Sequence, residues 1–157
     1  PGDILPGVTE FVADLRSAGL KTAIGSSSRN ARRILERIGL LGGFDAIVDG
    51  TDVEHSKPAP DVFLLAATRL GVPPAACLVV EDAAAGVAAA VAAGMRCLGV
   101  GPASEHPCAH HRADDLRTVR FSDLSPGPIE ARPAAPATRE ETAPRSAEAA
   151  VLPAAAN

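Results

Sequence analysis

The stretch Cys77-Leu78-Val79-Val80-Glu81-Asp82, followed by Ala83-Ala84-Ala85-Gly86-Val87, decides how this chain is expected to fold. A short unbroken apolar run is typical of a strand that is covered on both faces, as in a parallel sheet. The run stops at two adjacent carboxylates, which places them at the sheet edge where open α/β folds bind ligands. Hard oxygen ligands at that edge suit Mg²⁺. The alternative is that Asp82 caps the next helix and that Glu81 is solvated.

The composition fits one ordinary domain and argues against several classes of partner. The chain has 157 residues, 46% of them hydrophobic and only 3% aromatic, so its core must be mostly aliphatic. A net charge of -4 provides no basic surface for nucleic acid, and no apolar run approaches the roughly 18 residues that span a membrane. Three widely spaced cysteines favour reduced thiols. We therefore expect a cytoplasmic protein without nucleic-acid or membrane partners.

Helical and strand-like patterns alternate along the first 124 residues, which predicts an α/β fold with a doubly wound parallel sheet. Strands are predicted at 21–25, 44–48, 77–80 and 96–100, with an edge strand at 117–121. Helices are predicted from residue 8 to just before Gly19, from the serine run to Gly39, and at 60–70 and 83–93. From residue 125 the chain is rich in Pro, Ala, Glu and Arg. We expect a core domain over 1–124 and a disordered tail over 125–157.

Polar groups suited to a phosphate and a metal follow three of the predicted strands. Ser26-Ser27-Ser28-Arg29-Asn30 offers hydroxyls and backbone N–H groups at a helix start, where anions bind. Lys57 precedes two prolines that stiffen its loop, so it can neutralise charge on a phosphate with little loss of freedom. Glu81 and Asp82 come third. Taken singly these are an ordinary cap, a surface lysine and a cap acid, but their order is more specific than any one of them.

The runs Gly25-Ser26-Ser27-Ser28-Arg29-Asn30, Lys57-Pro58-Ala59-Pro60-Asp61 and Val80-Glu81-Asp82-Ala83, with Gly86 and Ala93-Gly94-Met95, resemble the haloacid dehalogenase superfamily. The resemblance extends over about residues 4 to 124 and is strongest to the sugar-phosphate mutases and phosphatases related to β-phosphoglucomutase. It implies Mg²⁺-dependent phosphoryl transfer on a sugar phosphate through an aspartyl-phosphate, with β-glucose 1-phosphate converted to glucose 6-phosphate. Plain phosphatase activity on a small phosphorylated metabolite is the alternative. The full-length protein is expected to be a monomer.

The resemblance also implies a role for each site residue. Ser26 would donate a hydrogen bond to the transferring phosphoryl group, and Lys57 would bridge that group and the nucleophilic carboxylate. Glu81 and Asp82 would hold Mg²⁺. Ser26, Ser27, Ser28, Arg29 and Asn30 would bind the substrate, the last three at its non-reacting phosphate.

One departure from the family pattern bears on activity. Family members begin with a strand ending in Asp-x-Asp, whose first Asp is the nucleophile, followed by a helical cap domain. This chain begins at Pro1 after both, so we expect a fragment that lacks the first strand and the cap. Val48-Asp49-Gly50-Thr51-Asp52 has the wrong spacing for the motif and is interpreted as a turn. The chain alone is expected to be inactive, with unpaired strand edges that invite aggregation or pairing with another chain. A non-catalytic remnant that binds a partner through those edges is the third hypothesis.

A second group of potential metal ligands lies after the predicted strand at 96–100. His106, Cys108, His110 and His111 are ligand types that bind Zn²⁺, but their spacing matches no closed four-ligand pattern. We interpret this segment as a solvated loop.

Overall fold

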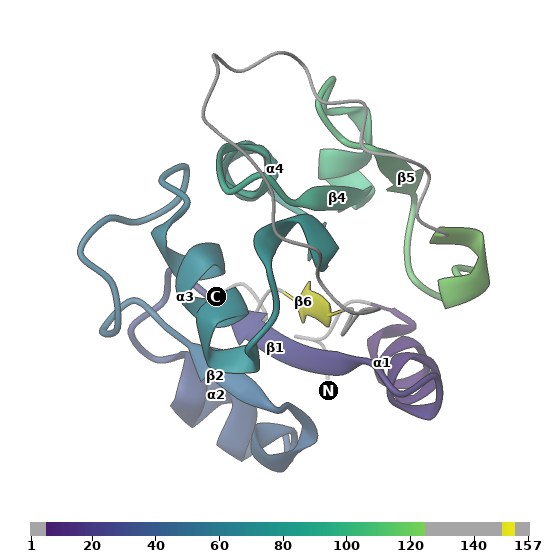
Figure 1. Cartoon of the computed structure of the whole chain (residues 1–157). Helices are drawn as coiled ribbons and strands as arrows, with labels where there is room; N and C mark the ends of the chain where they lie inside the picture. Colours follow the sequence, from purple (N-terminus) through teal and green to yellow (C-terminus); the bar gives the residue numbers. More distant parts are fainter. Residues whose placement is uncertain (1–5, 125–148, 153–157) are drawn as a thin grey trace, which may run out of the picture.

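The computed structural model describes residues 6–124 and the backbone of residues 149–152. Figure 1 shows strands of a central sheet with helices on both sides. The α-helices are α1 (Val8–Ser17), α2 (Ala31–Arg37), α3 (Asp61–Leu70) and α4 (Ala84–Ala92). The strands are β1 (Lys21–Gly25), β2 (Ala46–Val48), β3 (Cys77–Glu81), β4 (Arg96–Val100), β5 (His111–Ala113) and β6 (Ala149–Leu152). Short 3₁₀ helices are η1 (Leu41–Gly43), η2 (Pro74–Ala76), η3 (Gly101–Glu105) and η4 (Phe121–Leu124).

The sheet has the strand order β2-β1-β6-β3-β4-β5, and every neighbouring pair is parallel. Parallel neighbours require crossover connections, and helices α2, α3 and α4 lie between successive strands of the chain. The doubly wound α/β class predicted from the sequence is therefore confirmed.

Two separate apolar cores lie on the two faces of the sheet. Helices α3 and α4 pack with Ala23, Val79 and Cys97 on one face. Helices α1 and α2 pack with the alternate strand residues, such as Ile24 and Val80, on the other face. Successive side chains of a strand point to opposite faces, so a strand buried on both sides is apolar throughout. This explains the unbroken apolar run that precedes Glu81.

The segment after β4 differs from its prediction. The edge strand is β5 rather than residues 117–121, and η4 follows it. Leu116 and Leu124 are both buried in the core beneath α1 and α2, and the amide of Phe121 donates to Asp14 of α1 at 3.1 Å. Val119 and Phe121, the apolar residues of the predicted strand, pack against the same core instead.

The end of the chain also differs from its prediction. Residues 149–152, expected to belong to a disordered tail, form β6 between β1 and β3. Because β6 pairs with both β1 and β3, these two strands do not present the unpaired edges predicted from the sequence. Residues 125–148 and 153–157, also assigned to the tail, lie outside the described residues. Within the described residues, no helix is both long and apolar enough to cross a membrane.

Candidate active site at the carboxyl edge of the sheet

Lys57 joins two strand ends that are not neighbours in the sheet. Its loop lies between β2 and α3, and its Nζ donates to the Gly25 carbonyl of β1 at 3.1 Å and to the Glu81 carboxylate of β3. The ammonium also lies 4.6 Å from the centre of the Phe63 ring, a favourable position for a cation. The structure therefore brings the predicted Lys57 to the predicted Glu81 at the end of β3. The contact lies beside the serine run.

Glu81 is the more deeply placed of the two adjacent acids. It is 1% exposed, and its carboxylate occupies the space where a side chain of residue 86 would lie, so only a glycine fits there. Burial raises the pKa of Glu81 above its ordinary value, and the nearby Lys57 ammonium opposes that rise. A carboxylate held by a cation in this way is less free to serve as a metal ligand. Glu81 is therefore not solvated, and the alternative considered from the sequence is wrong for this residue.

Asp82 is partly exposed at the same edge, and its side chain makes no hydrogen bond within the described residues. Helix α4 begins at Ala84 with Ala83 as its N-cap and no side-chain cap, so the alternative role of Asp82 as the helix cap is wrong. Among the described residues no three His, Cys, Asp or Glu side chains are grouped closely enough to hold a metal. The two acids fit Mg²⁺ as a partial set, because this ion takes one or two carboxylates and completes its shell with water and substrate phosphate. Asp82 is the better placed ligand.

The serine run forms a compact loop between β1 and α2. Ser26 is buried, and its Oγ accepts from the Ser28 amide at 3.1 Å, while Ser28 Oγ accepts from the Asn30 amide at 3.2 Å. Ser27, Arg29 and Asn30 are exposed. The serines thus order the loop before α2, while their hydroxyl protons remain available for an anion.

A second loop, predicted from the sequence to be a turn, holds the serine loop in place. Val48 accepts from the Ser26 amide at 3.0 Å, and the Gly50 amide donates to Ser28 at 3.1 Å. A Cβ at Gly50 would overlap the Ser27 carbonyl oxygen. Gly50 therefore has to be a glycine because the two backbones approach closely here. The Asp-Gly pair predicted a turn but did not reveal this contact with the serine loop.

Two aspartates anchor this second loop. Asp49 is 2% exposed and accepts from the Thr51 amide and hydroxyl at 2.9 and 2.6 Å, and it pairs with Arg32 at 3.1 Å. Asp52 bonds Arg32 of α2 and Arg69 of α3. The Arg69 hydrogen bond is the main reason that the pKa of Asp52 lies well below its usual range. The Asp49 carboxylate thus serves to hold this loop together, which agrees with the interpretation of Asp49 as a turn residue.

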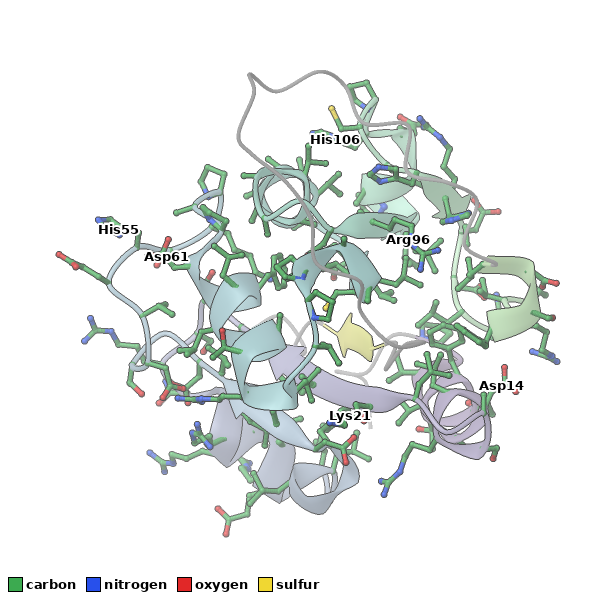
Figure 2. All side chains as sticks on the ribbon, in the orientation of Figure 1. Asp14, Lys21, His55, Asp61, Arg96 and His106 are labelled. Atoms are coloured by element: carbon green, nitrogen blue, oxygen red, sulfur yellow. The ribbon has the colours of Figure 1, made fainter. Side chains whose placement is uncertain are left out.

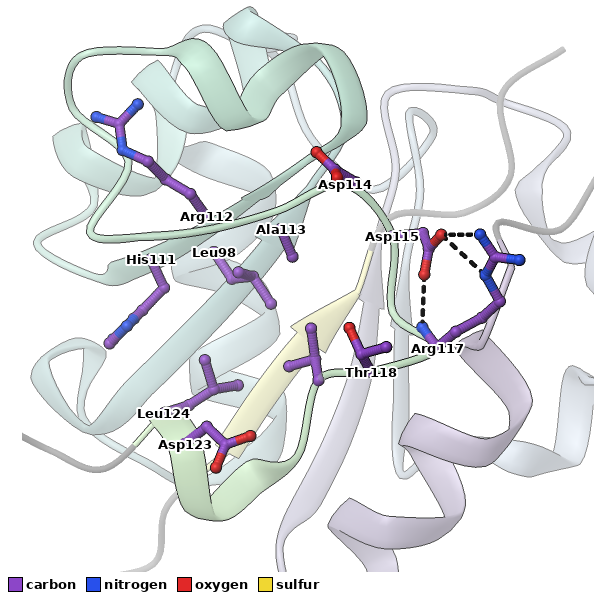
Figure 3. Close-up of a pocket in the computed structure, with 11 residues that line it drawn as sticks. Leu98, His111, Arg112, Ala113, Asp114, Asp115, Arg117, Thr118, Asp123 and Leu124 are labelled. Carbon is purple, nitrogen blue, oxygen red and sulfur yellow. Dashed lines mark hydrogen bonds and ion pairs between the residues drawn. The ribbon is translucent and has the colours of Figure 1, made fainter.

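Other polar groups of the chain lie away from this edge. The Nδ1 atoms of His106 and His110 accept from the Cys108 and Cys97 amides, and these residues form no metal-type group among those described. His55 and Asp61 form an exposed pair at 2.9 Å, visible at the periphery in Figure 2. A cavity of about 700 Å³ lies between β5 and η4, and none of the predicted site residues lines it (Figure 3).

An open parallel sheet whose serine loop, lysine and acid pair meet at one edge belongs to the doubly wound α/β class, in which that edge binds the ligand. Within this class the chain belongs to the haloacid dehalogenase-like hydrolases, whose family model matches residues 1–94.

Its relatives include both mutases and phosphatases. The chain is 46% identical over 101 residues to β-phosphoglucomutase of Bacillus subtilis, an alignment that covers 64% of this chain and 45% of that protein. It is 51% identical over 76 residues to the fructose-1-phosphate phosphatase of Escherichia coli, covering 48% and 40% respectively. The crystal structure of β-phosphoglucomutase from Clostridium difficile superposes with a TM-score of 0.72 at 35% identity, covering 78% of this chain and 55% of the other. The chain thus spans about half the length of these relatives.

Proposed function

We propose that the protein of which this chain is part catalyses Mg²⁺-dependent phosphoryl transfer on a sugar phosphate. The observation that carries the proposal is the position of Lys57, whose ammonium joins the ends of β1 and β3 directly beside Ser26. A cation fixed at that place can neutralise negative charge on a transferring phosphoryl group. Membership of the haloacid dehalogenase-like hydrolases supports the same chemistry.

In this proposal each loop performs one task. Ser26 donates a hydrogen bond to an oxygen of the transferring phosphoryl group, and Lys57 binds a second oxygen while it stays paired with Glu81. Arg29 and Asn30, both exposed beside the serines, bind the non-reacting end of the substrate together with Ser27 and Ser28. The attacking carboxylate comes from a strand outside the described residues. Without it, positioning and charge neutralisation have no nucleophile to assist.

Asp82, with Glu81 behind it, is the proposed site of Mg²⁺. When bound there, the ion would supply positive charge to the phosphoryl oxygens. Because Glu81 already contacts Lys57, Asp82 carries most of the ligation from this chain. The remaining ligands would be water, phosphate oxygens and groups outside the described residues.

Mutase and phosphatase activities are the two candidate outcomes of this chemistry. The Bacillus relative is named a β-phosphoglucomutase and the Escherichia relative a fructose-1-phosphate phosphatase, so identity favours neither strongly. Arg29 and Asn30 are exposed next to Ser28 and could bind a second phosphate. This arrangement favours a substrate that carries two phosphates during the reaction, and hence the mutase. A non-catalytic remnant is the remaining candidate, favoured by the presence of β6 in the sheet position between β1 and β3.

The test is an activity assay of the complete protein with β-glucose 1-phosphate and a catalytic amount of the bisphosphate. A mutase yields glucose 6-phosphate, whereas a phosphatase yields inorganic phosphate. Lys57→Ala should lower turnover by about 10²–10³-fold, since it removes a charge-neutralising group, and Asp82→Asn should raise the Mg²⁺ concentration required. Turnover of Lys57→Ala within about twofold of wild type would refute the role of Lys57, and Mg²⁺-dependent turnover by the 157-residue chain alone would refute the need for an outside nucleophile.

A further inference from the structure

The loop that carries Lys57 is closed by a pair of side chains on its outer side. The Nδ1 of His55, which precedes Lys57, lies 2.9 Å from the Oδ2 of Asp61, the first residue of α3. The His55 side chain is 65% exposed and that of Asp61 32%, and both lie at the periphery of the molecule (Figure 2). The pair therefore joins the two ends of the segment 55–61 without entering the site itself.

The segment between the two partners has little conformational freedom of its own. Pro58 and Pro60 have fixed φ angles, and the Ala59 amide donates to the Ser56 carbonyl at 3.0 Å. Few backbone angles of the segment remain free, and a bridge between its two ends restricts those that do. The direction in which Lys57 leaves the loop is thus set in part by a contact that Lys57 does not make.

The Lys57 side chain is directed inward, in contrast to the outer pair. It is only 11% exposed, and its ammonium reaches the Gly25 carbonyl at 3.1 Å and the Glu81 carboxylate. Because the stem of a lysine is flexible, the position of its ammonium depends on where the loop backbone lies. An outward movement of the loop would withdraw the ammonium from the ends of β1 and β3 and expose it to solvent.

The charge of His55 decides how strong the outer pair is. Asp61 raises the pKa of His55 above its ordinary value, and Glu54, the other charged group that acts on His55 within the described residues, adds to the rise. The hydrogen bond from His55 lowers the pKa of Asp61 in turn. Below the raised pKa both partners are charged, which makes the stronger hydrogen bond. As pH rises through that pKa, His55 loses its charge and this contribution is lost.

We propose that the His55–Asp61 pair is a proton-operated clamp that positions Lys57. His55 and Asp61 are positioning residues, because they act on the site only through the loop 55–61. When His55 is protonated, the clamp is closed and the Lys57 ammonium is held between the ends of β1 and β3. When His55 is neutral, the loop is looser and the ammonium is more accessible to solvent. The effect of the clamp on turnover rests on the proposed function, whereas its effect on the position of Lys57 does not.

The experiment compares the acetylation rates of Lys57 and Lys21 in the same chain by peptide mass spectrometry, between about pH 6 and pH 9. Lys21 is exposed at the start of β1 and corrects for the pH dependence of the reagent. In wild type the rate of Lys57 relative to Lys21 should rise about two- to fivefold with pH, as expected for the loss of an exposed ion pair. The midpoint of the rise should equal the pKa of His55 measured by NMR. A constant ratio, or a midpoint that does not match the titration of His55, would overturn the proposal.

Two variants remove the partners separately. His55→Ala and Asp61→Asn should both give the high ratio of alkaline wild type at every pH. His55→Ala leaves the acid in the first turn of α3 in place, so it decides the matter if circular dichroism shows that Asp61→Asn has lost structure. A His55→Ala variant that keeps the low ratio of wild type at pH 6 would refute the clamp.

Glu54→Gln is the matched control, since it removes a negative charge beside His55 but not the hydrogen bond to Asp61. It should keep the rise in the ratio, with a midpoint at lower pH than in wild type, and loss of the rise in this variant would show that Asp61 is not the partner that matters. The labelling requires no catalysis. A chain that shows the clamp while the complete protein transfers no phosphate would therefore contradict the proposed function alone.

Discussion

Lys57 and Glu81 form an ion pair that is largely withdrawn from solvent. The Glu81 carboxylate is enclosed by α4, with Gly86 leaving the space that it fills. Removing Lys57 would leave this carboxylate in an apolar setting without a cation, which is costly for the charged form. The pair is therefore expected to govern stability as well as any chemistry at this edge.

The first prediction concerns the loss of this ammonium. Lys57→Met should destabilise the chain by about 3 kcal/mol at pH 8, because it leaves an unpaired buried charge. The pKa of Glu81 would rise further in this variant, so the folded state would hold its proton to higher pH than the unfolded state. Stability of Lys57→Met should accordingly fall as pH increases from about 4 toward that raised pKa. Urea unfolding at pH 5 and pH 8 measures this difference.

The matched control is the double variant Lys57→Met with Glu81→Gln, in which both charges are replaced by neutral groups of similar size. It should recover more than half of the stability lost at pH 8, because no buried charge remains. Equal destabilisation of the single and double variants would show that the lysine acts through packing on Phe63 and not through its charge.

At the scale of elements, the loop after β2 holds the loop after β1. Two backbone hydrogen bonds, from Ser26 to Val48 and from Gly50 to Ser28, fix the serine loop against β2. Their geometry requires Gly50 to approach Ser27 more closely than any side chain allows. The position of the proposed phosphate-binding serines is thus set by a loop that contributes no ligand of its own.

The second prediction tests this support. Gly50→Ala should separate the two loops and destabilise the chain by about 1–3 kcal/mol, since overpacking against a backbone carbonyl has no flexible atom to give way. The Ser26 and Gly50 amides should exchange with solvent faster than in wild type. Gly42→Ala, where an added Cβ has no neighbour within 4 Å, is the control and should leave both amides unchanged. Unchanged exchange in Gly50→Ala would disprove the supporting role.

The sequence predicted the elements better than it predicted their contacts. Strands 77–80 and 96–100 were recognised because burial on both faces makes a strand apolar throughout, and the helix that ends at Gly71 has a glycine with φ of 68° where a side chain would be strained. The strand at 149–152 was missed because alanine-rich sequence in a Pro-rich tail carries no strand signal by itself. Its pairing depends on partners more than 65 residues away in β3. Such long-range pairing is not encoded in local pattern.

The candidate site shows the same division between local and distant information. Order along the chain placed Ser26, Lys57 and Glu81 at one edge, because parallel strands all end there. That Glu81 lies beneath Gly86 and that Asp82 remains open could not be predicted, since two adjacent acids look alike in sequence. Glu81 is the last residue of β3 and Asp82 lies just beyond it, and only the packing of α4 decides which of the two is enclosed.

At the scale of the whole molecule, Asp52 ties together helices from opposite faces of the sheet. Its carboxylate accepts from Arg69 of α3 at 2.7 Å and from Arg32 of α2 at 3.1 Å, and both arginines also donate to the Ile47 carbonyl of β2. These helices cover the two separate cores. The edge of the sheet at β2 is therefore closed by one acid and two cations.

The last prediction follows from the lowered pKa of Asp52. Because the folded state binds this proton less readily than the unfolded state, stability from Asp52 is present above about pH 4 and is lost as pH falls further. Asp52→Asn should therefore lower the free energy of unfolding at pH 7 by about 1 kcal/mol, a modest value because both arginines are partly exposed to solvent. The difference from wild type should shrink steadily below pH 4. Asp114→Asn, at an exposed aspartate, is the control and should show no such difference from wild type at either pH. If the stability difference of Asp52→Asn persists undiminished at pH 3, the charge of the carboxylate is not what joins the two helices.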